Sequence, residues 1–277
     1  MDEELERARQ AISETITNGD FVLPSMPEVA LRVREVAEDD EVDAQSISKI
    51  IGTDAALAAT MIKVSNSALF STKHPSTNLV QAITRMGIRY SCTLAIGAAM
   101  EQLFQSTSEG VDDRLRASWR HSTNVASLCH VYCKTYTRLK PDQASLAGLV
   151  HEIGKLPILF WADDLEWDDE VIDELITSLH PSIGQLVLKE WAFPEELRIV
   201  PAEYMNLTRE ADEPDYTDLV TVANLHACAG KDHPLGHVDL AGVSAFQRLG
   251  IDIEEVVFDS DSGDAFTGTP EPLTATA

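Results

Sequence analysis

The stretch "GLVHEIGKL", residues 148–156, places His151 directly beside Glu152 within an apolar, helix-like run. Neighbouring residues on a helix lie about 100° apart around its axis, so the two side chains do not share one face. A zinc helix of the HExxH type would need a second histidine at the position that Lys155 occupies. The doublet can therefore bind a metal only if ligands from other helices complete the site. The candidates for these ligands are His121 and His180.

The composition excludes several classes of protein. The 46 acidic and 21 basic residues give a net charge of −25, which repels the phosphates of nucleic acids and anionic lipids. Apolar runs such as "AIGAAM" are far shorter than the roughly 18 residues of a membrane span. The charged N-terminus "MDEELERARQ" lacks the apolar segment of a signal peptide, and the four cysteines lie in apolar helical contexts typical of reduced thiols. We therefore expect a cytoplasmic protein that binds neither nucleic acid nor membrane.

The spacing of apolar residues predicts helices along most of the chain and no strand, so the expected fold class is all-α. Asp43 and Asp54 precede the helical patterns "AQSISKII" and "AALAATMIKVSNSALF" and are predicted N-caps. The segment "IRYSCTLAIGAAMEQLF", 88–104, is apolar on nearly all sides, which predicts a buried central helix. A long helix is expected at about 112–138, and the next helix carries the opening motif. Further helices are expected at about 168–179, 181–192, 194–206, 215–229 and 240–248.

Two polar stretches interrupt this helical pattern. "QSTSEGVDD", 105–113, is rich in turn-forming residues and is the predicted boundary between two halves. Residues 258–277 are acidic and then rich in Ser, Thr and Pro, with little to bury, which predicts a disordered tail.

Longer motifs connect these pieces to known proteins. "HSTNVA" from residue 121, "AGLVHEIGKL", "HPSIGQLVLKEW" and "TVANLHA" resemble the HD superfamily of metal-dependent phosphohydrolases. "FVLPSMPEVALRV", "SKIIGTDAALAATMIKVSNSALF" and "LVQAITRMGIRYSCTLAIGAAMEQLF" resemble more narrowly the HDOD domain, an HD-related regulatory module of bacterial signalling proteins.

The resemblance covers about residues 15–230 and implies an all-α fold of the HDOD type. An N-terminal helical bundle, about 15–105, would pack on an HD-like helical half, about 112–230. Residues 1–14 would form an N-terminal helix extension, and residues 231–257 a short C-terminal helical extension.

The HD pattern implies a metal site at His121, His151, Glu152 and Asn224, with His180 as a further candidate. Two positions depart from that pattern, because Glu152 and Asn224 stand where it has aspartates. A neutral amide at Asn224 leaves a single carboxylate, whereas hard divalent ions such as Mg²⁺ are usually held by several charged oxygens. The resemblance therefore implies a vestigial site at which no cofactor is expected, although Mn, Fe or Mg would be the candidate metals. In an active enzyme His151, Glu152 and Lys155 would be the catalytic residues.

Three functions remain open. The resemblance favours a non-catalytic signal-transduction module that regulates by binding a protein or a nucleotide. The alternative is a metal-dependent phosphohydrolase or phosphodiesterase acting on a nucleotide or cyclic dinucleotide. A third hypothesis is a redox or metal sensor using Cys129 and Cys133, which share one helix face, although the pair is better explained as small core residues.

A module without chemistry must act through an exposed binding surface. The loop in "SNSALFSTKHPSTNL" is turn-rich but carries an aromatic residue and two candidate cations in an otherwise acidic chain: Phe70, Lys73 and His74. We therefore predict it as the contact for an acidic or phosphorylated signalling partner. The seam around "STSEGVDD" is the other candidate surface.

Overall fold

The structure is a computed structural model, and it describes residues 2–18, 21–37, 39, 41–67, 70, 74–165, 167–229 and 234–253. Within these ranges the chain forms helices and contains no strand, which confirms the all-α prediction. No helix in the described ranges is both long and apolar enough to cross a membrane. The predicted tail, 258–277, lies outside the described residues, as do residues 231–233 and 254–257 of the expected 231–257 extension.

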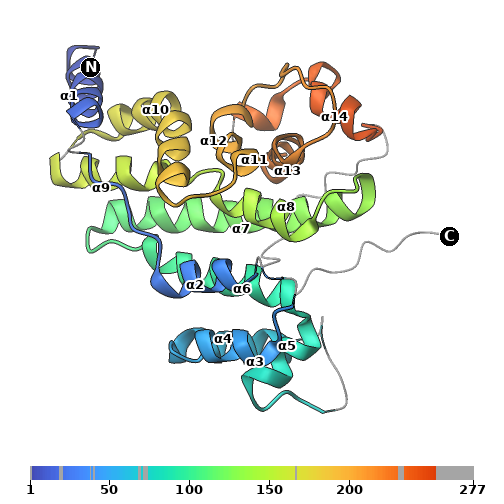
Figure 1. Cartoon of the computed structure of the whole chain (residues 1–277). Coiled ribbons are helices and arrows are strands. Elements are labelled where there is room, and N and C mark those ends of the chain that lie inside the picture. Colours follow the sequence, from blue (N-terminus) through green and yellow to red (C-terminus); the bar gives the residue numbers. More distant parts are fainter. Residues whose placement is uncertain are drawn as a thin grey trace.

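The N-terminal bundle lies on one side of the long central helix (Figure 1). The predicted caps are present: Asp43 accepts a hydrogen bond from the Ser46 backbone N–H at 2.7 Å, and Asp54 accepts from Ala56 and Leu57. The helix expected at 88–104 is largely buried and begins after Gly87, whose φ of 85° suits glycine. The helices of this bundle are α2 (Glu28–Ala37), α3 (Ala44–Ile51), α4 (Ala55–Ser65), α5 (Leu79–Met86) and α6 (Ile88–Met100), followed by the 3₁₀ turn η2 (Glu101–Leu103).

The chain continues with the central helix α7 (Glu109–Tyr136), against which α8 (Pro141–Val150) packs. Pro141 opens α8 at a position where a missing N–H costs nothing. The remaining helices lie above α7 in Figure 1. They are α9 (Lys155–Leu165), α10 (Asp169–Glu190), α11 (Glu195–Arg198), α12 (Val200–Glu203), α13 (Tyr216–Cys228) and α14 (Ser244–Leu249), with the 3₁₀ turns η3 (Pro234–His237) and η4 (Leu240–Gly242).

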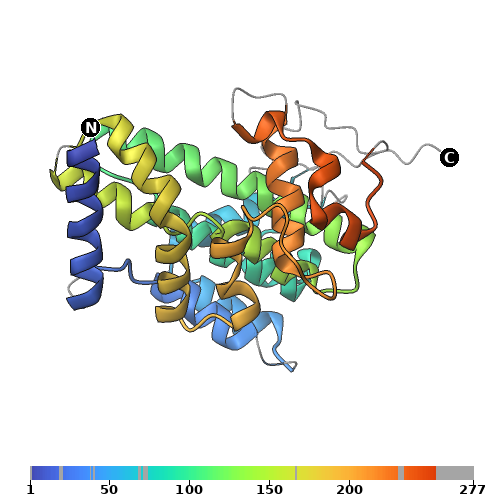
Figure 2. The same ribbon diagram turned by 90° about the horizontal axis from the view of Figure 1, so that it is seen from above.

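The N-terminal segment crosses from one half to the other. Helix α1 (Asp2–Asn18) packs on α10, where Arg9 and Glu174 form an ion pair at 3.1 Å. Figure 2 shows α1 at one end of the molecule and α13 and α14 at the other. After α1, the Pro24 carbonyl accepts a hydrogen bond from the Trp191 indole at 2.8 Å. This segment is thus joined to α10 by an ion pair and to Trp191 by a hydrogen bond.

Glycine decides how closely α8 approaches α7. A Cβ atom on Gly148 would lie 2.5 Å from the Ala126 Cα on α7, a distance that real Cβ atoms do not tolerate. The turn after α8 makes a similar approach to α10, because a Cβ on Gly154 would lie 2.1 Å from the His180 carbonyl oxygen. These contacts hold the His151–Glu152 segment between α7 and α10.

Several predicted helix boundaries were wrong. The expected helices at 168–179 and 181–192 are one helix, α10, because Pro181 interrupts one backbone hydrogen bond without ending the helix. The helix expected at 194–206 is divided into α11 and α12, and the one expected at 240–248 into η4 and α14. Helix α7 begins at Glu109, inside the stretch 105–113 that was predicted as a boundary.

We predict that Gly148→Ala destabilises the protein by about 1–3 kcal/mol, because the added methyl group forces α8 away from the α7 backbone. Gly110→Ala is the matched control, since it lies in the exposed first turn of α7 and a Cβ there meets nothing within 4 Å. The Gly110→Ala change is expected to stabilise the folded protein by up to about 1 kcal/mol, because alanine favours the helical conformation more than glycine does. Urea unfolding measures both; equal effects of the two substitutions would contradict the close approach.

Candidate metal centre

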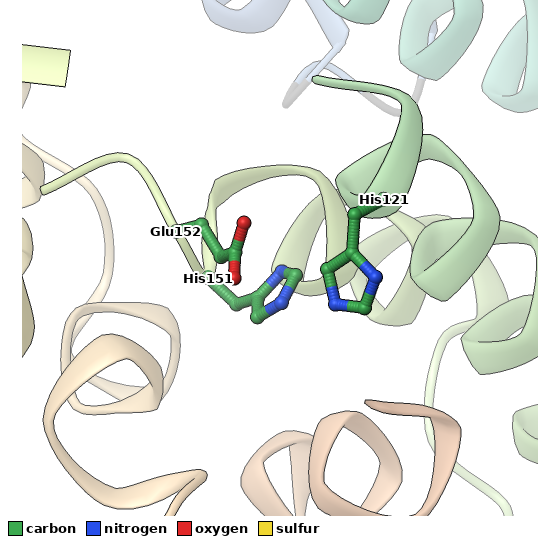
Figure 3. A group of neighbouring side chains, drawn as sticks. All are labelled: His121, His151 and Glu152. Carbon is green, nitrogen blue, oxygen red and sulfur yellow. The ribbon is translucent and has the colours of Figure 1, made fainter. Parts of the chain in front are cut away.

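The sequence-predicted site residues converge from three segments of the second half. His121 lies near the middle of α7, His151 and Glu152 lie in the turn between α8 and α9, and Asn224 lies on α13. Figure 3 shows the His121 and His151 rings and the Glu152 carboxylate turned toward one another. One nitrogen of each ring and one carboxylate oxygen lie within 4.8 Å of one another. Three groups at this separation can share one divalent ion after small side-chain movements.

His151 is fully buried and its tautomer is fixed by the backbone. Nδ1 donates a hydrogen bond to the Gly148 carbonyl at 2.7 Å, which leaves Nε2 without a proton. Burial lowers the pKa of His151 to about 3, even though Glu152 acts in the opposite direction, so the ring is neutral. Nε2 has no hydrogen-bond partner within the described ranges. A buried imidazole with Nδ1 held by a carbonyl and Nε2 unpartnered is the form of histidine that binds metals.

Glu152 is buried beside His151 but is already engaged. Its Oε2 accepts a hydrogen bond from Ser118 Oγ at 2.8 Å, and its Oε1 pairs with the Lys155 ammonium. Burial raises the pKa of the Glu152 carboxyl, but the charge and hydrogen bond of Lys155 together with the neighbouring His121 and His151 outweigh burial and hold the pKa well below its ordinary value. The carboxylate is therefore ionised, and its charge is balanced within the protein by Lys155.

His121 and Asn224 form a hydrogen bond with each other. His121 Nε2 donates to the Asn224 amide oxygen at 2.7 Å. Two sulfur atoms flank the same amide, with Cys228 Sγ 3.9 Å from Oδ1 and Met205 Sδ 3.8 Å from Nδ2. The amide oxygen thus accepts a hydrogen bond from a residue that the HD pattern would make a fellow ligand.

His180 is not one of the three residues whose ligand atoms cluster, which are His121, His151 and Glu152. Its Nδ1 donates a hydrogen bond to the Ile176 carbonyl at 2.7 Å, and its Nε2 accepts a hydrogen bond from the Tyr204 hydroxyl at 2.9 Å. Tyr204 also packs edge-on against the His151 ring, with centroids 4.9 Å apart. Burial raises the pKa of Tyr204 well above its ordinary value, so the phenol stays protonated and can donate this hydrogen bond. His180 therefore positions Tyr204, which in turn orients His151.

Two residues of the site were not predicted from the sequence. Ser118 precedes His121 by three positions on α7, and that spacing places both on one helix face, so a usable signal existed. Tyr204 contacts the site from the end of α12, and no local pattern indicates this.

Two other sequence-predicted sites have different surroundings. Cys129 and Cys133 are both buried, and burial raises the pKa of each thiol, which disfavours the reactive thiolate that a redox sensor needs. Phe70 is half-buried and its ring packs on Tyr90 with centroids 5.3 Å apart. His74 is exposed, and its carbonyl accepts a hydrogen bond from Arg85. Lys73 lies outside the described residues.

The order of the motifs and the all-helical core agree with a single family. The profile of the HDOD domain matches residues 23–206, about two thirds of the chain. The chain belongs to the HDOD family. The boundaries of 15–230 inferred from the motifs, and the division into halves at 105–112, stay predictions.

Solved structures resemble this HDOD protein along most of its length. A crystal structure from Shewanella amazonensis, provisionally named a metal-dependent phosphohydrolase, is 31% identical, covers 90% of this chain and 98% of its own, and has a TM-score of 0.72. An HDOD domain protein of unknown function from Geobacter sulfurreducens is 18% identical, with coverage of 94% and 91% and a TM-score of 0.64. At that identity the second likeness concerns the fold alone.

A curated relative is an uncharacterised protein of Treponema pallidum (strain Nichols), 23% identical over 208 residues. The match covers 69% of this chain and 39% of the Treponema protein. The HDOD chain therefore spans well under half the length of that relative.

We predict that Glu152→Gln destabilises the protein by about 1–3 kcal/mol, because it leaves the partly buried Lys155 ammonium without its counter-charge. Arg116→Gln is the control, since it breaks an exposed pair with Asp112 on α7 and should change stability by less than about 1 kcal/mol. The free energy of unfolding in urea measures both. If Glu152→Gln left the free energy of unfolding unchanged, the ion pair with Lys155 would not be what holds the turn in place.

Proposed function

We propose that this HDOD protein is a non-catalytic signal-transduction module of a bacterial cell, which regulates by binding and retains a vestigial HD metal site. One observation carries the proposal: three of the four groups that would bind the metal, those of His121, Glu152 and Asn224, are already paired with other protein groups. Glu152 is held by Ser118 and Lys155, and Asn224 is held by His121.

The charge of the site supports this proposal. Glu152 contributes one negative charge and Lys155 cancels it, while Asn224 and the neutral His151 contribute none. A hard divalent ion gains most from anionic oxygens. Binding one here would require separating Glu152 from Lys155 and breaking the bond between His121 and Asn224. Both rearrangements cost free energy, and the ion would gain contact with only one carboxylate.

The alternative is a metal-dependent phosphohydrolase, and two observations favour it. His151 Nε2 is buried and, within the described ranges, unpartnered. The relative from Shewanella is provisionally named for that activity. The two imidazoles and the carboxylate fit a divalent transition metal, and His121, His151, Glu152 and Asn224 would hold it. The metal would supply an activated water, Ser118 would orient Glu152, and Lys155 would lie near the anionic substrate.

Signalling by binding requires a partner surface, and the loop of Phe70, Lys73 and His74 remains the proposed contact. The exposed His74 supports it. The packing of Phe70 on Tyr90 argues that the aromatic ring mainly anchors the loop, so the polar groups would make the contact.

We predict that the purified protein retains less than one equivalent of manganese or iron and does not hydrolyse bis(p-nitrophenyl) phosphate with added Mn²⁺. Elemental analysis and the phosphodiesterase assay measure these, with His151→Ala as the control for contaminating activity. The expected rates of the wild type and His151→Ala are equal. Stoichiometric metal together with turnover that His151→Ala abolishes would instead establish the hydrolase.

We further predict that the double change Glu152→Asp with Asn224→Asp raises the affinity for Mn²⁺ by about tenfold or more, because it restores the second carboxylate. The single change Glu152→Asp is the control, since it alters side-chain length without adding charge. Calorimetric titration with Mn²⁺ measures all three proteins. Equal affinities of the wild type and the double variant would show that the missing charge is not what weakens metal binding.

A further inference from the structure

A pocket of about 220 Å³ lies on the seam between the N-terminal bundle and the HD-like half, away from the candidate metal centre. Its walls come from α2 and α6 on one side and from the start of α8 and the Phe193–Leu197 segment on the other. Its apolar lining includes Ile96, Leu146 and Leu197. Since both halves form the walls, a ligand bound there would contact the two halves at once.

The charged residues of this pocket are mostly basic, in a chain whose net charge is −25. Arg34, Arg89 and Lys140 line it, and among the residues that the structure describes Asp142 is its one acidic lining residue. The Cys92 thiol adds no negative charge, because burial raises its pKa to about 11. Three cations around a small pocket attract an anion even when the overall surface is acidic.

Arg34 is held in position before any ligand arrives. Its guanidinium lies over the Phe193 ring, 4.7 Å from the centroid, and donates to the Trp191 carbonyl at 2.6 Å. A fixed guanidinium loses little conformational entropy when an anion binds, which favours binding.

The first turns of two helices also line the pocket. Ile88 and Arg89 begin α6, and Asp142 and Gln143 belong to the first turn of α8. Neither helix has a side-chain N-cap. The positive ends of both helix dipoles therefore add to the attraction of the three basic side chains.

Gln143 contributes a separate observation that points to a ligand. Its Oε1 atom is buried and has no hydrogen-bond partner in the part of the chain that the structure describes. A buried acceptor of this kind costs free energy unless a donor reaches it. Because this atom is buried, the Gln143 side chain would have to turn toward the pocket before a hydroxyl group on a bound molecule supplied that donor.

We propose that this seam pocket binds a small phosphate-bearing metabolite, with its phosphate held by Arg34, Arg89 and Lys140 and a hydroxyl group reaching Gln143. The volume is below the roughly 300 Å³ at which pockets begin to hold drug-sized ligands, so a small phosphate ester fits better than a dinucleotide. Binding would strengthen the contact between the two halves and so give this module a small-molecule input. The proposal does not depend on whether the HD site is vestigial.

The test uses the full chain and two probes, inorganic phosphate and glycerol 3-phosphate, titrated calorimetrically at constant ionic strength set with chloride. The pocket variant is Arg89→Gln with Lys140→Gln, both exposed residues, and Arg34 is left intact because it also supports Phe193. The control is Lys63→Gln with Lys189→Gln, which removes the same two charges from exposed positions on α4 and α10.

The wild type and the control variant are expected to bind both probes with a Kd of ~1 mM or tighter, with glycerol 3-phosphate the tighter of the two. The pocket variant should lose about tenfold or more in affinity for each, since two charge-assisted contacts to the phosphate are gone. Absence of binding to the wild type would overturn the proposal. Equal losses in the pocket and control variants would also overturn it, because the binding would then reflect net charge.

Discussion

The close contact between Gly148 on α8 and the α7 backbone at Ala126 is the constraint on which the rest of the site depends. It places the end of α8 against α7, so that His151 reaches His121, with ring centroids 5.5 Å apart. The same approach lets Glu152 reach Ser118 on α7. Gly154 then brings the following turn against the α10 backbone near His180. Two glycines therefore determine which side chains meet at the centre of the HD-like half.

What those side chains do depends on charge more than on position. The geometry is suitable for a metal, because two imidazoles and a carboxylate lie within 4.8 Å of one another. The electrostatics are less suitable, because Lys155 neutralises the carboxylate and Asn224 brings no charge. A site that is assembled but neutral is consistent with a family fold retained for binding. The basic pocket at the seam shows the reverse pattern, with positive charge concentrated where both halves meet.

Local chemistry made part of this structure predictable. The all-α class followed from apolar periodicity, and the Asp43 and Asp54 caps followed from short side chains that accept backbone N–H bonds. Pro181 misled the prediction of α10, because a proline inside a helix and one between helices look alike in sequence. The meeting of His121, His151 and Asn224 was expected only through the resemblance, since no spacing rule relates residues about 30 and 100 positions apart. Tyr204 was missed because its role arises from tertiary packing alone.

The state of the His151 ring in the presence of metal tests the vestigial site most directly. Long-range ¹⁵N–¹H NMR spectra would be recorded before and after one equivalent of Mn²⁺, with the exposed His74 as an internal reference for non-specific effects. A site in which His121, Glu152 and Asn224 are already paired within the protein predicts a neutral His151 ring protonated at Nδ1, with signals that persist when Mn²⁺ is added. Selective loss of the His121 and His151 signals, with those of His74 unchanged, would show that the paired groups open to bind the ion and would contradict the vestigial site.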